Sequence, residues 1–129
     1  MQYLYYFANT SLVVRLLTYL SKRVDFILEA VTVIYLVDRW VVRIKLKSPL
    51  LPAKARDFES FLLENGYQYR LSSPVSRALD GLDAGMSITE VMNRYHVVVV
   101  SHGALRPADI EDFRTTFVRG LGYCPPSLV

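Results

Sequence analysis

Residues 42–47 alternate strictly between apolar and cationic side chains. The alternating residues are Val42, Ile44 and Leu46 on the apolar side and Arg43, Lys45 and Lys47 on the cationic side. The side chains of a β-strand point in turn to the two faces of its sheet. The alternation therefore predicts a strand that is buried on one face and cationic on the other.

The segments on either side of this strand predict an order of strands and helices. Clusters of Tyr, Phe, Ile and Val predict strands, and apolar residues at three- and four-residue spacing predict amphipathic helices. The predicted elements are a strand over 2–8, a helix over 12–22, strands over 25–36 and 39–47, a helix over 52–64 and a strand over 67–71. The order β-α-β-β-α-β is that of the ferredoxin-like α+β fold, in which two helices cover one face of a four-stranded antiparallel sheet.

Polar residues and glycine mark the ends of the two helices. We expect Thr10 or Ser11 to cap the first helix, because hydroxyl side chains accept hydrogen bonds from amide groups at a helix start. Pro52 suits the first turn of the second helix. The pair Asn65-Gly66 predicts a left-handed conformation at the end of that helix.

Residues 72–129 form an extension that a plain ferredoxin-like fold does not need. Ser87 and Glu90 have the spacing of a capping box at a helix start. Residues 78–95 resemble the first two helices of a helix-turn-helix, but a β-prone segment stands where a recognition helix should follow. The predicted elements of the extension are helices over 73–82 and 88–95, a strand over 97–100 and a helix from 107 to 120.

The composition is that of one globular domain. The chain has 129 residues, of which 52% are hydrophobic and 21% are charged, so it can bury a core and is not typical of disordered or low-complexity proteins. We expect a single domain over 1–129, with a core over 1–71 and the extension over 72–129. The chain has five Asn and Gln residues in all, a depletion typical of heat-adapted proteins.

Cysteine usage and hydropathy bear on the cellular compartment. Cys124 is the single cysteine, so an internal disulfide framework is excluded and a cytoplasmic location is expected. The first residues lack the positive region of a signal peptide. The sequence has no uncharged apolar run of about 18 residues, so we expect no membrane span.

Four segments between residues 3 and 71 carry a resemblance to a known family. They are Ser11–Leu17 (SLVVRLL), Val24–Ile27 (VDFI), Trp40–Ile44 (WVVRI) and Phe61–Tyr67 (FLLENGY). In this pattern the chain resembles the ACT domain, a small regulatory βαββαβ module often fused to or partnered with metabolic enzymes. The Pro-Gly pair that the family carries before its first helix is replaced here by Asn9-Thr10, and its usual Gly after that helix by Arg23.

The resemblance implies a ligand-binding loop after the first strand, where ACT domains commonly contact small effectors such as amino acids. Asn9, Thr10 and Ser11 occupy that position and would donate hydrogen bonds to such a ligand. The alternative is that these three residues only cap the first helix.

The cationic strand face suggests a second kind of site. The first and third strands are central in a ferredoxin-like sheet, so Arg43, Lys45 and Lys47 could lie beside Tyr3 and Tyr5 or their neighbours. Cations interleaved with aromatic rings suit phosphate contacts and base stacking, and the net charge of +3 is compatible with such a partner. The third strand lacks the Gly and paired aromatic residues of an RRM signature, and a solvated face or a homodimer interface is the alternative.

The sequence has no catalytic signature. His96 and His102 have no nearby Cys or carboxylate cluster at metal-ligand spacing, and the chain has no Gly-rich phosphate-binding loop. We therefore expect no enzyme activity, no metal and no cofactor. The expected function is a small regulatory or protein-interaction module that forms a homodimer and could bind a small effector, and the alternative is a nucleic-acid-binding protein.

Overall fold

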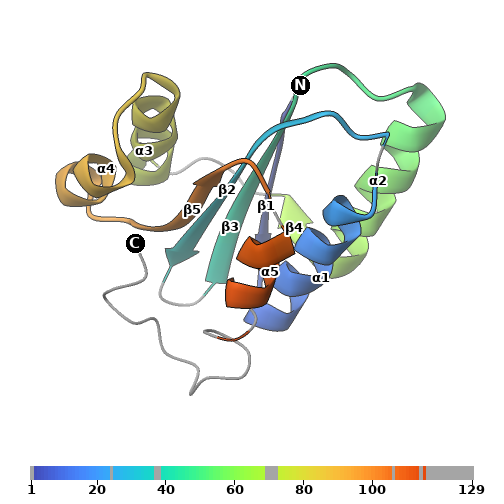
Figure 1. Cartoon of the computed structure of the whole chain (residues 1–129), viewed down its shortest axis with the longest axis horizontal. Coiled ribbons are helices and arrows are strands. Elements are labelled where there is room, and N and C mark those ends of the chain that lie inside the picture. The colour runs from blue at the N-terminus through green and yellow to red at the C-terminus, as the bar shows by residue number, and fades with distance from the viewer. Residues whose placement is uncertain are drawn as a thin grey trace.

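The chain forms an α+β fold with a five-stranded antiparallel sheet and helices on both faces (Figure 1). The computed structural model describes residues 2–23, 25–36, 39–68, 73–105, 107–113 and 115. The strands are β1 (Gln2–Phe7), β2 (Leu28–Leu36), β3 (Arg39–Leu46), β4 (Tyr67–Gln68) and β5 (Val98–Gly103). The helices are α1 (Thr10–Ser21), α2 (Pro52–Asn65), α3 (Ser73–Asp83), α4 (Ile88–Tyr95) and α5 (Pro107–Phe113).

The strands lie in the order β4-β1-β3-β2-β5. As expected, β1 and β3 are central. The sequence pattern leaves the place of the strand at 97–100 open. In the structure β5 pairs antiparallel with β2 and adds a fifth strand, so the order is not strictly ferredoxin-like. The β-branched residues of β5 are suited to a strand in this position. β2 pairs with β3 along one edge and with β5 along the other.

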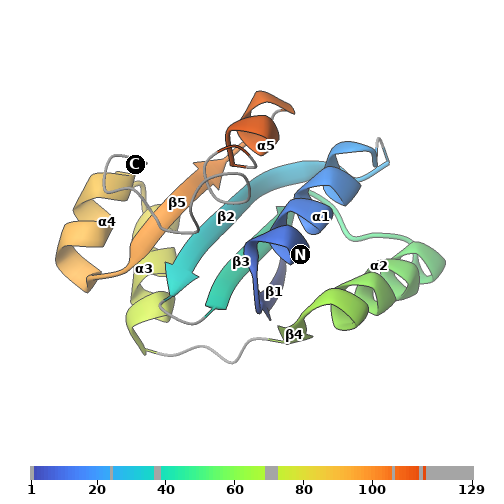
Figure 2. The same ribbon diagram turned by 90° about the horizontal axis from the view of Figure 1, so that it is seen from below.

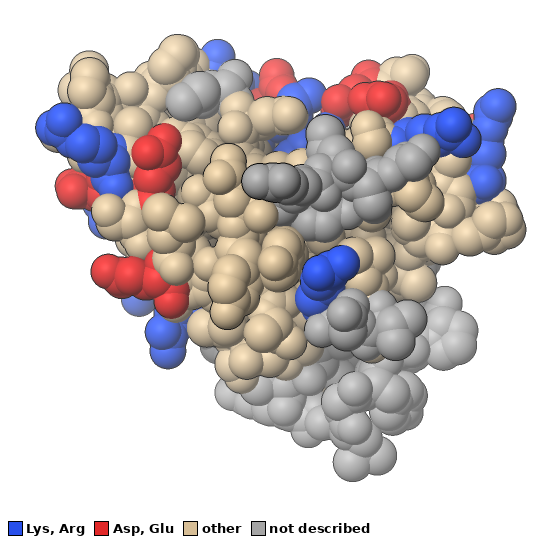
Figure 3. Space-filling model, turned by 180° about the vertical axis from the view of Figure 1, so that it is seen from behind, with Lys and Arg blue, Asp and Glu red and all other residues tan. Residues whose placement is uncertain are grey.

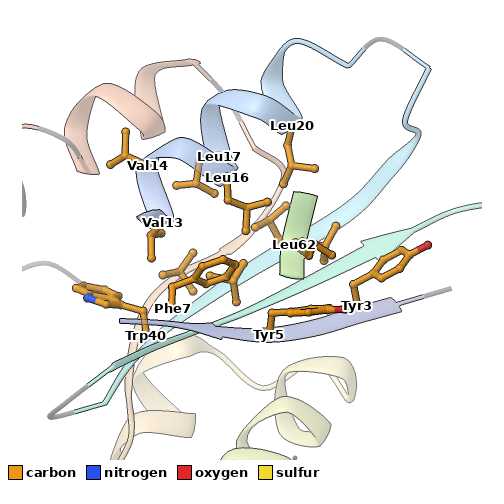
Figure 4. Packing of buried hydrophobic residues seen from close by; sticks show 14 of the residues in the cluster. Tyr3, Tyr5, Phe7, Val13, Val14, Leu16, Leu17, Leu20, Trp40 and Leu62 are labelled. Carbon is orange, nitrogen blue, oxygen red and sulfur yellow. The ribbon is translucent and has the colours of Figure 1, made fainter. Parts of the chain in front are cut away.

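The first face of the sheet packs against α1, α2 and α5. Tyr3, Tyr5 and Phe7 of β1 point to this side, where they meet the leucines and valines of α1 (Figure 4). The ring of Phe58 from α2 lies edge-on to Tyr3, with 5.0 Å between ring centroids. Phe113 of α5 packs on Trp40 in the same way at 5.3 Å. The extension thus contributes to the core that the first 71 residues form.

The second face of the sheet is covered by α3 and α4 (Figure 2). The prediction of two helices on one face and an open opposite face is therefore wrong. Val75, Leu79 and Leu82 of α3 and Val91 of α4 bury the outward-facing residues of the long strands. The sheet residues in this second core are Ile34, Val41 and Val99. Burying these apolar residues favours the closed arrangement because it removes apolar surface from water.

The helix caps differ in part from the predicted ones. The α1 cap is Asn9, whose Oδ1 accepts a hydrogen bond from the Leu12 amide at 3.0 Å, so the assignment to Thr10 or Ser11 is wrong. Ser87 caps α4 as predicted, accepting from the Glu90 amide at 3.1 Å. Gly66 ends α2 in an extended conformation with φ −157°, not in a left-handed one.

Gly66 is required by close packing. A Cβ atom at this position would lie 2.6 Å from the carbonyl oxygen of Tyr6 and 2.7 Å from the ring of Phe7. The chain turns there from α2 into β4 directly against β1. A glycine allows this approach, which explains Gly66 without a left-handed turn.

Several element ends differ from the predicted ones. The second strand begins at Leu28 rather than residue 25, and β5 covers Val98–Gly103 rather than 97–100. β4 is described as Tyr67–Gln68, and the rest of its predicted range lies outside the described residues. The predicted end of the last helix, at Gly120, and Cys124 also lie outside them.

Candidate functional site

The predicted mixture of tyrosines and cations on one sheet face is divided between two faces. In the register of β1 on β3, Tyr3 lies opposite Ile44, whereas Leu4 lies opposite Arg43. Directly opposed residues in a sheet share a face, so Tyr3 and Tyr5 belong to the first core and Arg43 and Lys45 to the second face. Burial raises the pKa of both tyrosines, and the charge of Glu59 raises it further.

Arg43 is a buried cation with a carboxylate partner from α3. It is 2% exposed. Its Nη1 donates a hydrogen bond to Oδ2 of Asp83 and its Nη2 donates one to Oδ1, each at 2.9 Å. Nζ of Lys45 also donates a hydrogen bond to Oδ1 of Asp83, at 3.2 Å, and lies 3.7 Å from Oε2 of Glu29. A fork of this geometry is among the stronger polar contacts in proteins, and it connects the centre of the sheet to α3.

The carboxyl group of Asp83 titrates under two opposed influences. Burial raises its pKa, but the hydrogen bonds and charges of Arg43 and Lys45 outweigh burial and hold the pKa below its ordinary value of 3.8. Asp83 is therefore ionised at neutral pH, and the ion pair is formed throughout the physiological range.

Thr32 and His102 continue this polar row toward β5. Thr32 pairs with Arg43 on one side and with His102 on the other, and its buried hydroxyl lies 2.7 Å from Nδ1 of His102. Burial lowers the pKa of His102, the charge of Arg43 lowers it further, and Asp83 partly offsets this effect. The imidazole is thus kept neutral beside two cations.

The remaining predicted site residues lie at the margins of the sheet. Lys47 is exposed just beyond the end of β3. Asn9 caps α1 with its side chain, and Thr10 and Ser11 are the first two residues of that helix, where Ser11 is exposed.

An aromatic stack on the second face was not among the predicted sites. The rings of Tyr6 and Tyr67 stack at 5.2 Å with an interplanar angle of 24°, and the guanidinium carbon of Arg39 lies 4.9 Å from the Tyr6 ring centroid. Tyr67 belongs to the edge strand β4 and is 60% exposed. The alternation along β1 could have placed Tyr6 on this face, but the pairing of β4 with β1 is a long-range contact that the sequence does not display.

A groove lies at the β4 edge of the sheet, between β1, β4 and α2. It has a volume of about 490 Å³ and is lined mainly by β1 residues together with Glu59 and Leu63 of α2 and Gln68 of β4. Leu63 is 61% exposed. We call Leu63, Tyr67 and this groove the β4-edge surface.

The described residues contain neither a metal-ligand cluster nor a membrane-spanning helix. In that part of the chain no group of three or more His, Cys, Asp and Glu side chains is placed to hold a metal ion. None of the helices described there is long and apolar enough to cross a membrane.

Comparison with solved structures shows a likeness in fold. The C-terminal domain of YpbH, known from a crystal structure, superposes with a TM-score of 0.53 and 15% sequence identity, over 89% of this chain and 97% of that one. At this identity the likeness shows the fold alone, a small α+β domain with an antiparallel sheet. No family model and no curated protein matches the chain.

Removing the carboxylate of Asp83 should destabilise the fold. In Asp83→Asn, the buried Arg43 loses its charged partner, and we expect a loss of about 2 kcal/mol in the free energy of unfolding, less than for a fully buried pair because the Asp83 side chain is 37% exposed. Urea unfolding at pH 7 measures this. The control Asp80→Asn, exposed on the same helix, should change stability by less than about 0.5 kcal/mol. A double variant with Arg43→Met should cost less than the sum of the singles, and additivity would contradict the pairing.

Protonation of His102 should destabilise the native state at mildly acidic pH. Its pKa is lower in the folded than in the unfolded chain, where it is near 6.5, so the unfolded state binds the proton more tightly. Unfolding free energy should therefore be highest above pH 6.5 and decrease as the pH falls from 6.5 through the folded pKa. His102→Gln should remove this decrease, whereas His96→Asn, at the exposed end of α4, should retain it. An unchanged pH profile in His102→Gln would refute the assignment.

Proposed function

We propose that this chain is a small non-enzymatic regulatory or protein-interaction module that acts as a homodimer. The observation that carries the proposal is the β4-edge surface, where two large apolar side chains are more than half exposed: Leu63, which lines the groove, and Tyr67 of the edge strand. Exposed apolar groups that gather at one edge of a domain are typical of interaction surfaces. A second copy that presents the same surface across a two-fold axis would bury them from both sides.

The polar groups of the second face support a structural role. Arg43 and Asp83 bond each other, Lys45 bonds Asp83, and Thr32 and His102 bond each other. An active site needs polar groups that turn to a substrate, whereas these groups join the extension to the sheet. This arrangement favours a module over an enzyme.

A regulatory role for the loop after β1 remains part of the proposal. In the ferredoxin-like, ACT-like interpretation of residues 3–71, Asn9, Thr10 and Ser11 would contact a small effector. The exposure of Ser11 and the position of Thr10 and Ser11 in the first turn of α1, directly after β1, support this. The capping bond of Asn9 leaves Thr10 and Ser11 as the more available donors.

The dimer proposal predicts a change of mass on polar substitution of the β4-edge surface. The wild-type chain should scatter light as a particle of twice 14.8 kDa at micromolar concentration, and the double variant Leu63→Ser/Tyr67→Ser should be monomeric because it removes the apolar contact. The control Leu51→Ser changes a leucine that is 69% exposed at the opposite end of α2 and should remain dimeric. A wild-type monomer at high concentration would refute the proposal.

Binding of single-stranded nucleic acid is the second candidate function. The specific observation in its favour is the Tyr6–Tyr67 stack with Arg39, because an exposed ring at the end of a stack suits a nucleobase. The pairing of Arg43 and Lys45 with Asp83 counts against the predicted cationic face, and Lys47 is the exposed cation of that set. On the side of the molecule that Figure 3 shows, Lys and Arg lie among Asp and Glu.

A fluorescent oligonucleotide titrated across a salt series tests this second function. Binding through phosphates should weaken steeply with salt, Tyr67→Ala should reduce affinity about tenfold through lost stacking, and Lys47→Glu should reduce the salt dependence. The control Leu51→Ser should bind like wild type. Absence of binding at low salt would exclude nucleic acid and leave the protein-interaction module.

A further inference from the structure

We propose that the outer edge of β5 binds an extended, basic segment of a partner protein as a sixth strand of the sheet. This site lies at the opposite end of the sheet from the β4-edge surface. It therefore goes beyond the proposed homodimer and does not depend on it.

The first support is the character of β5 as an edge strand. Within the described residues β5 pairs with β2 alone, so the backbone groups on its other side are not used by a strand. Edge strands are usually protected by charged residues or proline. β5 has neither, since its sequence is Val-Val-Val-Ser-His-Gly. Such an edge is a template for the addition of a strand.

The second support is a groove that follows the end of this strand. Two adjoining cavities, of about 380 and 200 Å³, share Ser101, Leu105 and Asp109 as lining residues. One wall is contributed by Ile88 at the start of α4, on the second face of the sheet, and the other by α5 on the first face. A groove walled from both faces lies in the plane of the sheet, where an added strand would run.

The third support is the chemistry of the groove, which defines the occupant. Its apolar lining includes Val31, Val100 and Leu105, and α5 adds two carboxylates, of which Asp112 is exposed to an incoming cation. Alternate side chains of an extended segment point to opposite faces. A segment that alternates apolar residues with Lys or Arg would thus place one set against the apolar lining and the other near the carboxylates.

The same charges disfavour a second copy of this chain at β5. A second copy would offer its own β5, Val-Val-Val-Ser-His-Gly, which carries no Lys or Arg to meet the carboxylates of α5. The basic segment of another protein matches the groove better, and we commit to it as the occupant.

Fluorescence anisotropy with a defined peptide tests the proposal. The probe is a blocked, labelled eight-residue peptide that alternates lysine and valine, and its counterpart alternates glutamate and valine. The lysine peptide should bind, more tightly at low salt, and the glutamate peptide should not. Asp112→Lys should weaken binding about tenfold, a change of about 1.4 kcal/mol. The matched control Asp57→Lys makes the same charge change at an exposed position on α2 and should leave binding unchanged.

Amide hydrogen exchange of the full chain locates the bound peptide. Added peptide should slow amide exchange in β5 and leave exchange in β4 unchanged. The double variant Leu63→Ser/Tyr67→Ser should show the same protection of β5, because the peptide site is separate from the β4-edge surface. Lack of binding, equal binding of the two peptides, insensitivity to Asp112→Lys or protection elsewhere would each overturn the proposal. Protection of β5 by an increase in protein concentration alone would also overturn it, because the occupant would then be a second copy.

Discussion

The ion pair between Arg43 and Asp83 is the interaction on which the arrangement of the second face depends. Arg43 lies in the middle of the central strand β3, and the helices of the extension remove it almost completely from water. A buried guanidinium without a partner would cost several kcal/mol, so the apolar residues of α3 and α4 can close over the sheet only where a carboxylate meets it. Asp83, at the last residue of α3, supplies that carboxylate in a two-bond geometry that also fixes the helix against the strand.

The sequence pattern predicted the elements better than their surroundings. Helices and strands follow from local spacing, and the alternation in residues 42–47 correctly placed apolar and cationic side chains on opposite faces. The same alternation fits a strand facing solvent and a strand whose cation is buried with a carboxylate. Asp83 is 40 residues away from Arg43 in the sequence, and the pattern of β3 does not indicate that partner.

Candidate site residues were harder to predict because they depend on which strands become neighbours. Tyr3 and Tyr5 were placed with the cations, yet the period of two along β1 directs them to the first core and directs Tyr6 to the second face. Tyr67 reaches Tyr6 only through the short pairing of β4 with β1. The two edges of the sheet consequently differ in chemistry. The β4 edge carries stacked aromatic rings, and the β5 edge has no charged residue of its own and lies beside carboxylates of α5.

The pairing of β5 with β2 also has a consequence for how the chain reaches its native state. Thr32 and His102 are 70 residues apart, whereas β2 and β3 are joined by a short connection and can pair locally. Contacts between distant segments require closure of a long loop before they contribute any stabilisation, and they slow folding. The hairpin of β2 and β3 is therefore expected to form early and β5 to be added late. Until it is added, the outer edge of β2 is exposed, which makes the nascent chain most susceptible to wrong strand pairing there.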